Sequence, residues 1–213
     1  MVRLGRLGGV ALAPWLVSRS GLSASVISVT VVIRRGRRRR GIEMTDEKQI
    51  EVRRVVQAPP DRVFALVSDP KQQQVIDGSG MLQGTTSGPV TAAGQVFTME
   101  MCRDDLGPWR TINTVTEFEP GTVIGWAPDL DRSHECQVAQ MLATVTTGGH
   151  TYAYGLHGTT EGTEVRLVYD WSGVTDPDFE ALCPFVSREQ LVNTLDRLAD
   201  AVRPAAARTS DDS

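Results

Sequence analysis

The sequence has 213 residues, of which 40% are hydrophobic and 23% charged, and its net charge is −4. This composition is typical of a globular protein and excludes collagen-like and low-complexity chains. The charge is unevenly distributed: residues 1–43 contain nine Arg and one Glu and carry +8, whereas the other residues include 13 basic and 25 acidic ones and carry −12. Because phosphate binding needs a surplus of Lys and Arg, we expect the acidic part to bind no nucleic acid.

The three cysteines, Cys102, Cys136 and Cys183, are too few and too scattered for a disulfide framework in a chain of this length. We interpret them as reduced thiols and expect a cytoplasmic protein. The pair His134 and Cys136 matches no standard zinc spacing, so we expect no metal site. We also expect no cofactor, and the sequence indicates no oligomeric state.

Residues 1–43 form a basic extension with two short apolar runs that Arg19 separates. The second run, 21–33, is too short for a membrane span, which needs roughly 20 apolar residues. The arginine-rich run 34–40 is typical of a nucleic-acid arm or a surface anchor. No small-residue cleavage site follows the apolar runs, which argues against a secretory signal. We expect this extension to be disordered and translation to begin at Met44.

The first predicted element is a strand at 49–56, where Ile50, Val52 and Val56 lie on one face. Arg54 shares that face, and it is either a cavity cation for an anionic or carbonyl-bearing ligand or a salt-bridged arginine. The segment APPDRVFALVSDP predicts a helix that starts at a proline and ends at the Asp-Pro pair. A second short helix is expected in KQQQVIDGSG.

Several strands and one long helix follow. The strands are predicted at 81–86, 95–103, 110–119, 122–128, 150–159 and 163–173. The segment SREQLVNTLDRLADAVRP begins with the capping-box spacing of Ser187 and Gln190 and carries an apolar stripe. This order predicts an α+β fold in which a curved antiparallel sheet packs against the C-terminal helix. The segment 129–147 is expected to be an irregular loop or an inserted strand.

Six blocks occur in a characteristic order: APPDRVFALVSDP, IDGSG, GQVFTMEM, VTEFEPGTVIGW, GHTYAYGL and GTEVRLVYDWSG. Over about residues 48–203 they resemble the polyketide cyclase/dehydrase branch of the START-like (SRPBCC) superfamily. The resemblance implies a helix-grip domain at 44–204: a curved seven-stranded antiparallel sheet around the C-terminal helix, two short helices after the first strand, and an apolar cavity. CPFVSREQL stands where an activator-like branch usually has a Gly-Trp pair, which favours the cyclase-like branch. Residues 205–213 are expected to form a flexible tail.

The last predicted hairpin, AYGLHGTTEGTEVRLVYDWSG, brings His157, Arg166 and Asp170 close together in sequence. Its loop length decides which side chains share a face, because a one-residue slip reverses every one of them. A three-residue loop mixes charged and apolar side chains, whereas a four-residue loop gathers the apolar ones on one face. Burial stabilises by about 1.5–3 kcal/mol for each apolar side chain, which favours the four-residue loop. We therefore predict Tyr154 beside Tyr169, with His157 in water and not paired with Asp170 as acid and base.

The inward faces of the predicted strands and the last helix supply the candidate ligand-binding residues. Aromatic rings and thioethers adapt to an apolar ligand, and a buried tyrosine hydroxyl needs a partner that a ligand can supply. The alternative is that these side chains only fill the core. The candidates are Arg54, Phe97, Met99, Met101, Ile112, Thr114, Trp126, Tyr152, Tyr154, Tyr169, Trp171, Leu191 and Leu195. Arg110 is a further candidate for the rim.

These observations predict a single-domain protein that binds a hydrophobic small molecule, lipid or polyketide-like, between sheet and helix. In relatives that aromatise polyketides a cavity arginine and an aromatic residue orient the chain. The resemblance therefore assigns that role to Arg54, Tyr152 and Tyr154, and leaves open whether the ligand is transformed. The alternative is a non-enzymatic protein-interaction module of the same fold, against which the missing Gly-Trp pair argues. No membrane span is expected.

Overall fold

The computed structural model describes residues 48–203. Within this range seven strands form one antiparallel sheet in the order β1-β7-β6-β5-β4-β3-β2, which confirms the predicted sheet. The strands are β1 (Gln49–Val56), β2 (Leu82–Gly84), β3 (Val96–Arg103), β4 (Gly107–Glu119), β5 (Val123–Leu130), β6 (Thr151–Thr159) and β7 (Gly162–Asp170). The predictions for residues 1–43 and 205–213 lie outside the described residues.

Three predicted helices are present, together with two that were not expected. They are α1 (Pro60–Val67), α2 (Pro70–Ile76), α3 (Gln137–Met141), α4 (Pro177–Glu180) and α5 (Arg188–Val202). The segment 129–147, expected to be an irregular loop or an inserted strand, is irregular except for the end of β5 and the unexpected short helix α3. Its first turn is capped by the sulfur of Cys136, which accepts a hydrogen bond from the Ala139 N–H at 3.4 Å. Cysteine is not a usual N-cap residue, so the sequence contains no start signal for α3.

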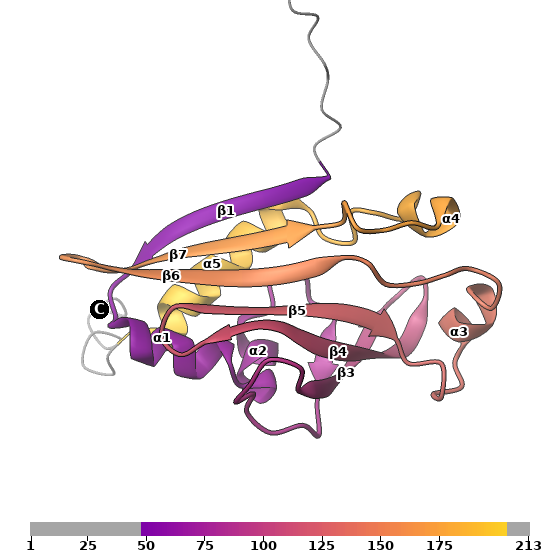
Figure 1. Cartoon of the computed structure of the whole chain (residues 1–213), viewed down its shortest axis with the longest axis horizontal. Coiled ribbons are helices and arrows are strands. Elements are labelled where there is room, and N and C mark those ends of the chain that lie inside the picture. The colour runs from indigo at the N-terminus through magenta and orange to yellow at the C-terminus, as the bar shows by residue number, and fades with distance from the viewer. Residues whose placement is uncertain (1–47, 204–213) are drawn as a thin grey trace, which may run out of the picture. The chain divides into compact units, whose positions relative to one another are not determined.

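The long helix α5 begins at the predicted capping box. The Ser187 hydroxyl accepts a hydrogen bond from the Gln190 N–H, and the Gln190 side chain accepts one from the Ser187 N–H. The sheet curves around α5, which lies behind β6 and β7 in Figure 1 and contacts β1, β7, α1 and α2. Its buried side chains are Leu191, Thr194, Leu195, Leu198 and Val202. This arrangement is the predicted helix-grip. No helix in the described range is both long and apolar enough to cross a bilayer.

A glycine lets the loop after α2 approach α5 closely. A Cβ atom at Gly78 would lie 2.3 Å from the Gln190 carbonyl oxygen and 2.5 Å from the Thr194 nitrogen. The Gly78 N–H donates to the Thr194 hydroxyl at 3.0 Å. The loop is held in shape by the Asp77 carboxylate, which accepts hydrogen bonds from both the N–H and the hydroxyl of Ser79. This contact fixes α2 and β2 against α5.

Strand β4 contains a bulge that changes which residues face the interior. The register with β5 shifts between Val115 and Glu117, so one extra residue is inserted there. Before the bulge, Asn113 and Val115 are buried. After it, Phe118 faces inward, and its ring meets that of Phe64 on α1 at 5.4 Å. One strand therefore presents odd-numbered residues to the interior in its first part and an even-numbered residue in its second.

Candidate functional site

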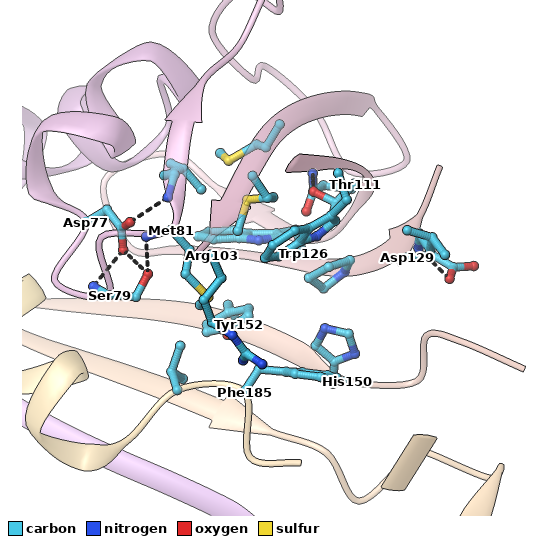
Figure 2. Close-up of a pocket in the computed structure, with 18 of the residues that line it drawn as sticks. Asp77, Ser79, Met81, Arg103, Thr111, Trp126, Asp129, His150, Tyr152 and Phe185 are labelled. Atoms are coloured by element: carbon cyan, nitrogen blue, oxygen red, sulfur yellow. Dashed lines mark hydrogen bonds between the residues drawn. The ribbon is translucent and has the colours of Figure 1, made fainter. Parts of the chain in front are cut away.

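A pocket of about 300 Å³ lies between the sheet, the loop after α2 and the segments that carry α3, α4 and the start of α5. The sheet contributes Met99, Met101, Trp109, Thr111, Asn113, Trp126, Tyr152 and Tyr154. The segment from α4 into α5 contributes Phe179, Leu182, Phe185, Val186, Leu191 and Thr194. Figure 2 shows side chains from both sides of the pocket, including Trp126 and Tyr152 from the sheet and Phe185 from the segment between α4 and α5. The wall is mainly apolar and rich in aromatic rings and thioethers.

The aromatic rings of three strands form one continuous layer. Trp126 on β5 stacks on Tyr152 and Tyr154 of β6, with ring centroids 6.0 Å apart in both pairs. Tyr152 in turn lies 4.7 Å from Tyr169 on β7. Stacked rings hold one another in place, because each restricts the side-chain rotation of its neighbour. The pocket therefore has a rigid flat wall suited to an apolar, planar surface.

Two tyrosine hydroxyls in this wall have no hydrogen-bond partner among the described residues. They belong to Tyr152 and Tyr154, whose pKa values are both raised by burial. A phenol is protonated at neutral pH and burial only disfavours its ionisation further, so each hydroxyl can donate and accept a hydrogen bond. The wall thus offers polar contacts to a bound molecule without adding a charge.

The charged side chains at the pocket already have partners within the protein. Arg103 forms two hydrogen bonds with Asp105, at 2.6 and 3.0 Å, and this carboxylate raises the pKa of the arginine. The Asp129 carboxylate accepts a hydrogen bond from the Thr147 hydroxyl at 2.5 Å. Residues 48–203 contain no group of three or more His, Cys, Asp or Glu placed to hold a metal ion. The site is therefore suited to binding by shape and hydrogen bonds rather than by ion pairing.

His150 is a buried polar residue in an aromatic environment. Its ring centroid lies 5.2 Å from that of Phe185, 5.8 Å from Phe179, and 6.0 Å from Tyr169. Burial lowers the pKa of His150 to about 4, and the nearby Asp129 carboxylate offsets only part of this effect. The imidazole is therefore uncharged at neutral pH.

A family model described as polyketide cyclase/dehydrase and lipid transport matches residues 47–203. The chain belongs to this family. The match covers the whole described region, including every strand of the sheet and the segments that line the pocket. It confirms the resemblance to the START-like superfamily.

Comparisons with individual proteins agree with this membership. The uncharacterized protein Rv0088 of Mycobacterium tuberculosis is 29% identical over 104 residues, which is 48% of this chain and 46% of that protein. The chain thus spans about half the length of the curated relatives it matches. Protein CV1439 of Chromobacterium violaceum is 19% identical (TM-score 0.52) and matches over 73% of this chain and 98% of that one. Protein Ms6760 of Mycobacterium smegmatis is 14% identical (TM-score 0.56), and the match covers 75% of this chain and 93% of that one. At these identities the two solved structures share the fold alone.

In this polyketide cyclase/dehydrase and lipid transport family member, about half of the candidate residues reach the pocket. Those on its wall are Met99, Met101, Trp126, Tyr152, Tyr154 and Leu191. Four others lie in or against the core: Phe97, Tyr169, Trp171 and Leu195. The Tyr169 hydroxyl already accepts a hydrogen bond from the Phe185 N–H at 3.4 Å and lies 3.9 Å from the Cys183 sulfur. The placement of these four residues on a cavity wall was wrong.

The cavity role assigned to Arg54 was also wrong. Arg54 does face α5, but β1 is an edge strand that α5 contacts directly. The guanidinium therefore meets the helix and pairs with Asp196, and the Arg54 side chain is 43% exposed. The orienting set of Arg54, Tyr152 and Tyr154 is not assembled in this member of the family, because only the two tyrosines reach the pocket.

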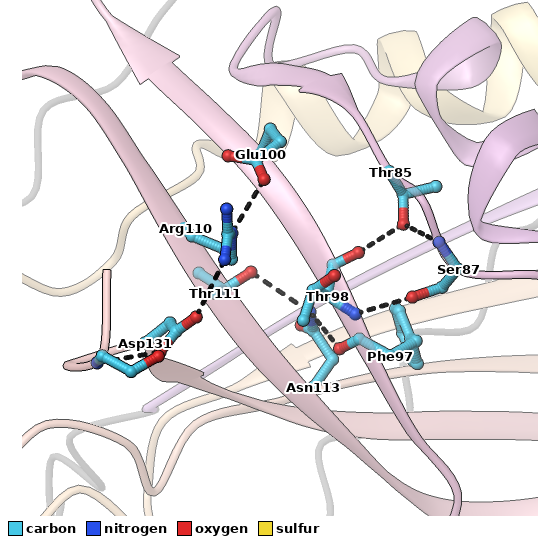
Figure 3. A network of polar contacts seen from close by, with 10 residues as sticks. Thr85, Ser87, Phe97, Thr98, Glu100, Arg110, Thr111, Asn113 and Asp131 are labelled. Carbon is cyan, nitrogen blue, oxygen red and sulfur yellow. Dashed lines mark hydrogen bonds and ion pairs between the residues drawn. The ribbon is translucent and has the colours of Figure 1, made fainter. Parts of the chain in front are cut away.

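Ile112 and Thr114 do not line the pocket, because the bulge in β4 reverses the faces of this part of the strand. Figure 3 shows the polar contacts that accompany β3 and β4 here. Arg110, the rim candidate, pairs with Glu100 at 2.8 Å and with Asp131 at 3.5 Å. Strict alternation counted back from Phe118 does not allow for the extra residue at the bulge, and it therefore assigned Ile112 and Thr114 to the interior face.

The predicted faces of the β6–β7 hairpin are confirmed, but its register was wrong by two residues. Tyr152 is opposite Tyr169, and Tyr154 is opposite Leu167. The loop has two residues instead of four, because pairing continues to Gly162. A Cβ atom there would lie 2.1 Å from the Val56 carbonyl oxygen, so glycine allows β7 to stay close to β1. An even-numbered shift preserves the faces, and His157 is exposed as expected.

Several residues of the pocket were not foreseen. Trp109 and His150 lie at the starts of strands, where the alternation pattern is short. Phe179 lies in the short helix α4, and Phe185 lies in the irregular segment between α4 and α5. Two phenylalanines in a short connection between β7 and α5 are a signal of burial that periodicity does not detect. Residues that flank regular elements thus complete the site of this family member.

Proposed function

We propose that this protein binds a hydrophobic small molecule, lipid or polyketide-like, in the pocket between the sheet and α5. The observation that carries the proposal is the pocket itself, with its layer of Trp126, Tyr152 and Tyr154. An enclosed apolar wall with a few unpaired polar groups is the usual form of a small-molecule site. The description of the family, which includes lipid transport, supports the same class of ligand.

The size of the pocket limits the ligand. Its volume of about 300 Å³ is at the lower end of the range for small-molecule sites, roughly 300–1,000 Å³. A compact ligand with a few fused rings, or one short acyl chain, suits this volume better than a lipid with two long chains. The apolar skeleton packs against the aromatic layer, and the hydroxyls of Tyr152 and Tyr154 supply hydrogen bonds to its polar groups.

The proposal is tested by native mass spectrometry of the full chain purified from its own host, followed by organic extraction. Two variants of the same strand form a matched pair. Thr111 lines the pocket, so Thr111→Trp fills it, whereas Thr114 is exposed and Thr114→Trp leaves it open. We expect an apolar molecule to accompany the wild type and Thr114→Trp, and to be absent from Thr111→Trp.

Circular dichroism establishes that both variants are folded before they are compared. A wild-type protein that carries no apolar molecule, and that also binds no lipid, polyketide or hydrophobic dye when these are added, contradicts the proposal. Equal retention of a ligand by folded Thr111→Trp and Thr114→Trp also contradicts it, because the ligand would then lie elsewhere.

A further inference from the structure

His150, on the pocket wall, carries a fully buried polar atom that the described residues do not satisfy. Within residues 48–203, Nδ1 of His150 is the one buried side-chain nitrogen or oxygen atom without a hydrogen-bond partner. Buried polar atoms are almost always paired, because an unpaired one loses its hydrogen bond to water and gains nothing in return. His150 lines the pocket, where a bound molecule can supply a hydrogen-bond partner to the imidazole.

The surroundings of His150 determine what kind of partner that is. The ring of His150 is surrounded by Phe179, Phe185 and Tyr169, which keep it out of water. Only 7% of the surface of His150 is exposed. The imidazole is neutral in this environment and therefore has one nitrogen that donates and one that accepts. A hydroxyl group can do both as well, so it can pair with either nitrogen.

We propose that His150 is the specificity-determining residue of the pocket, and that it selects ligands in which an aromatic, apolar skeleton carries a neutral hydroxyl group. This inference rests on the proposed function. The aromatic layer beside the ring, with Tyr152 at 6.4 Å, positions a planar skeleton next to the imidazole. Figure 2 shows His150 on the pocket wall with Tyr152 and Phe185, and Asp129 nearby.

The same arrangement disfavours a carboxylate in place of the hydroxyl. The neutral imidazole forms no ion pair with an anion, and the carboxylate of Asp129 repels it. Arg103, the cation of the pocket lining, is occupied by Asp105. Desolvation of a ligand carboxylate would therefore be poorly compensated at this position.

The test uses three probes that differ in a single group: naphthalene, 2-naphthol and 2-naphthoate. Their dissociation constants are measured by calorimetry at pH 7 with the full chain after organic extraction of any bound molecule. We expect 2-naphthol to bind about three- to tenfold more tightly than naphthalene, as one hydrogen bond provides, and 2-naphthoate to bind more weakly than 2-naphthol. His150→Phe should abolish the preference for 2-naphthol and leave the affinity for naphthalene within about twofold, because only the nitrogens are lost.

His157→Phe is the matched control, since it is the same substitution at an exposed position. It should keep the wild-type preference. A second measurement needs no variant at position 150. In the ¹⁵N-histidine-labelled wild type, 2-naphthol should shift the imidazole signals of one histidine, and naphthalene should not. His134→Phe and His157→Phe assign that histidine by elimination.

Each outcome decides a separate point. Equal affinities for naphthalene and 2-naphthol, or a preference that survives in His150→Phe, would overturn the role of His150 and leave the proposed function intact. Failure of all three probes to bind would overturn the assignment of an aromatic ligand. The native mass spectrometry described above then decides the proposed function independently.

Discussion

At the scale of single residues, His150 links the stability of the fold to pH. Its pKa falls from 6.5 to about 4 on burial, so between these values the unfolded chain binds a proton that the folded protein does not. The free energy of unfolding is therefore not reduced by His150 above about pH 6.5. It decreases as the pH falls toward 4, and this loss is about 3 kcal/mol at most. Urea unfolding at pH 7 and pH 4.5 should show this loss in the wild type and a smaller loss in His150→Phe. Identical losses would contradict the prediction.

Two tyrosines of the aromatic layer should respond differently to the loss of a hydroxyl. Tyr169 uses its hydroxyl within the protein, since it accepts the Phe185 N–H, whereas the Tyr154 hydroxyl has no such partner. We expect Tyr169→Phe to lower the free energy of unfolding by about 1 kcal/mol and Tyr154→Phe to leave it unchanged or slightly raised. Denaturant midpoints of the ligand-free proteins check this, and a larger loss for Tyr154→Phe would contradict it.

At the scale of elements, the contact between the loop after α2 and α5 depends on one missing side chain. Gly78→Ala would place a Cβ atom against the Gln190 carbonyl and force the loop away from the helix. We expect a loss of about 1–3 kcal/mol in the free energy of unfolding, which is the usual cost of overpacking. Gly88→Ala is the control, because nothing lies within 4 Å of a Cβ atom there. Equal denaturant midpoints for the two variants would show that α5 adapts to the extra atom.

The elements also show which features of the fold could be predicted from sequence. β1, α1, α2 and α5 have local signals: alternation, prolines at the start of helices, and the Ser187–Gln190 capping box. The short helices α3 and α4 have no apolar period to detect. The bulge in β4 could not be predicted because it depends on pairing with β5, and alternation alone does not show an extra residue. Ile112 and Thr114 were misplaced for that reason.

At the scale of the whole molecule, the fold follows from local sequence signals, whereas the site depends on contacts between distant residues. The order of the elements is enough to predict a sheet around a helix, because each element has to bury its apolar face. To predict the pocket, one must also know which residues each inward side chain contacts. Arg54 meets α5, whereas Tyr152 meets an open space bordered by Phe179 and Phe185. Such long-range contacts are absent from any local pattern.

Occupation of the pocket should stabilise the entire fold, because it is built from β3 to β7 together with α5. A ligand at one hundred times its dissociation constant adds about 2.7 kcal/mol to the free energy of unfolding. For a folded unit of this size we expect the melting temperature to rise by about 5–10 °C with the native ligand or, if the inference on His150 holds, with 2-naphthol. Thr111→Trp should show no rise in differential scanning fluorimetry, and a rise equal to that of Thr114→Trp would contradict the assignment of the pocket.

The bulge in β4 has a consequence for how the pocket can change during evolution. Because it adds one residue, removing that residue would turn the preceding half-strand over without altering the fold of the sheet. Ile112 and Thr114 would then enter the pocket, and Thr111 and Asn113 would leave it. A single codon deletion at this point would therefore exchange several wall residues at once.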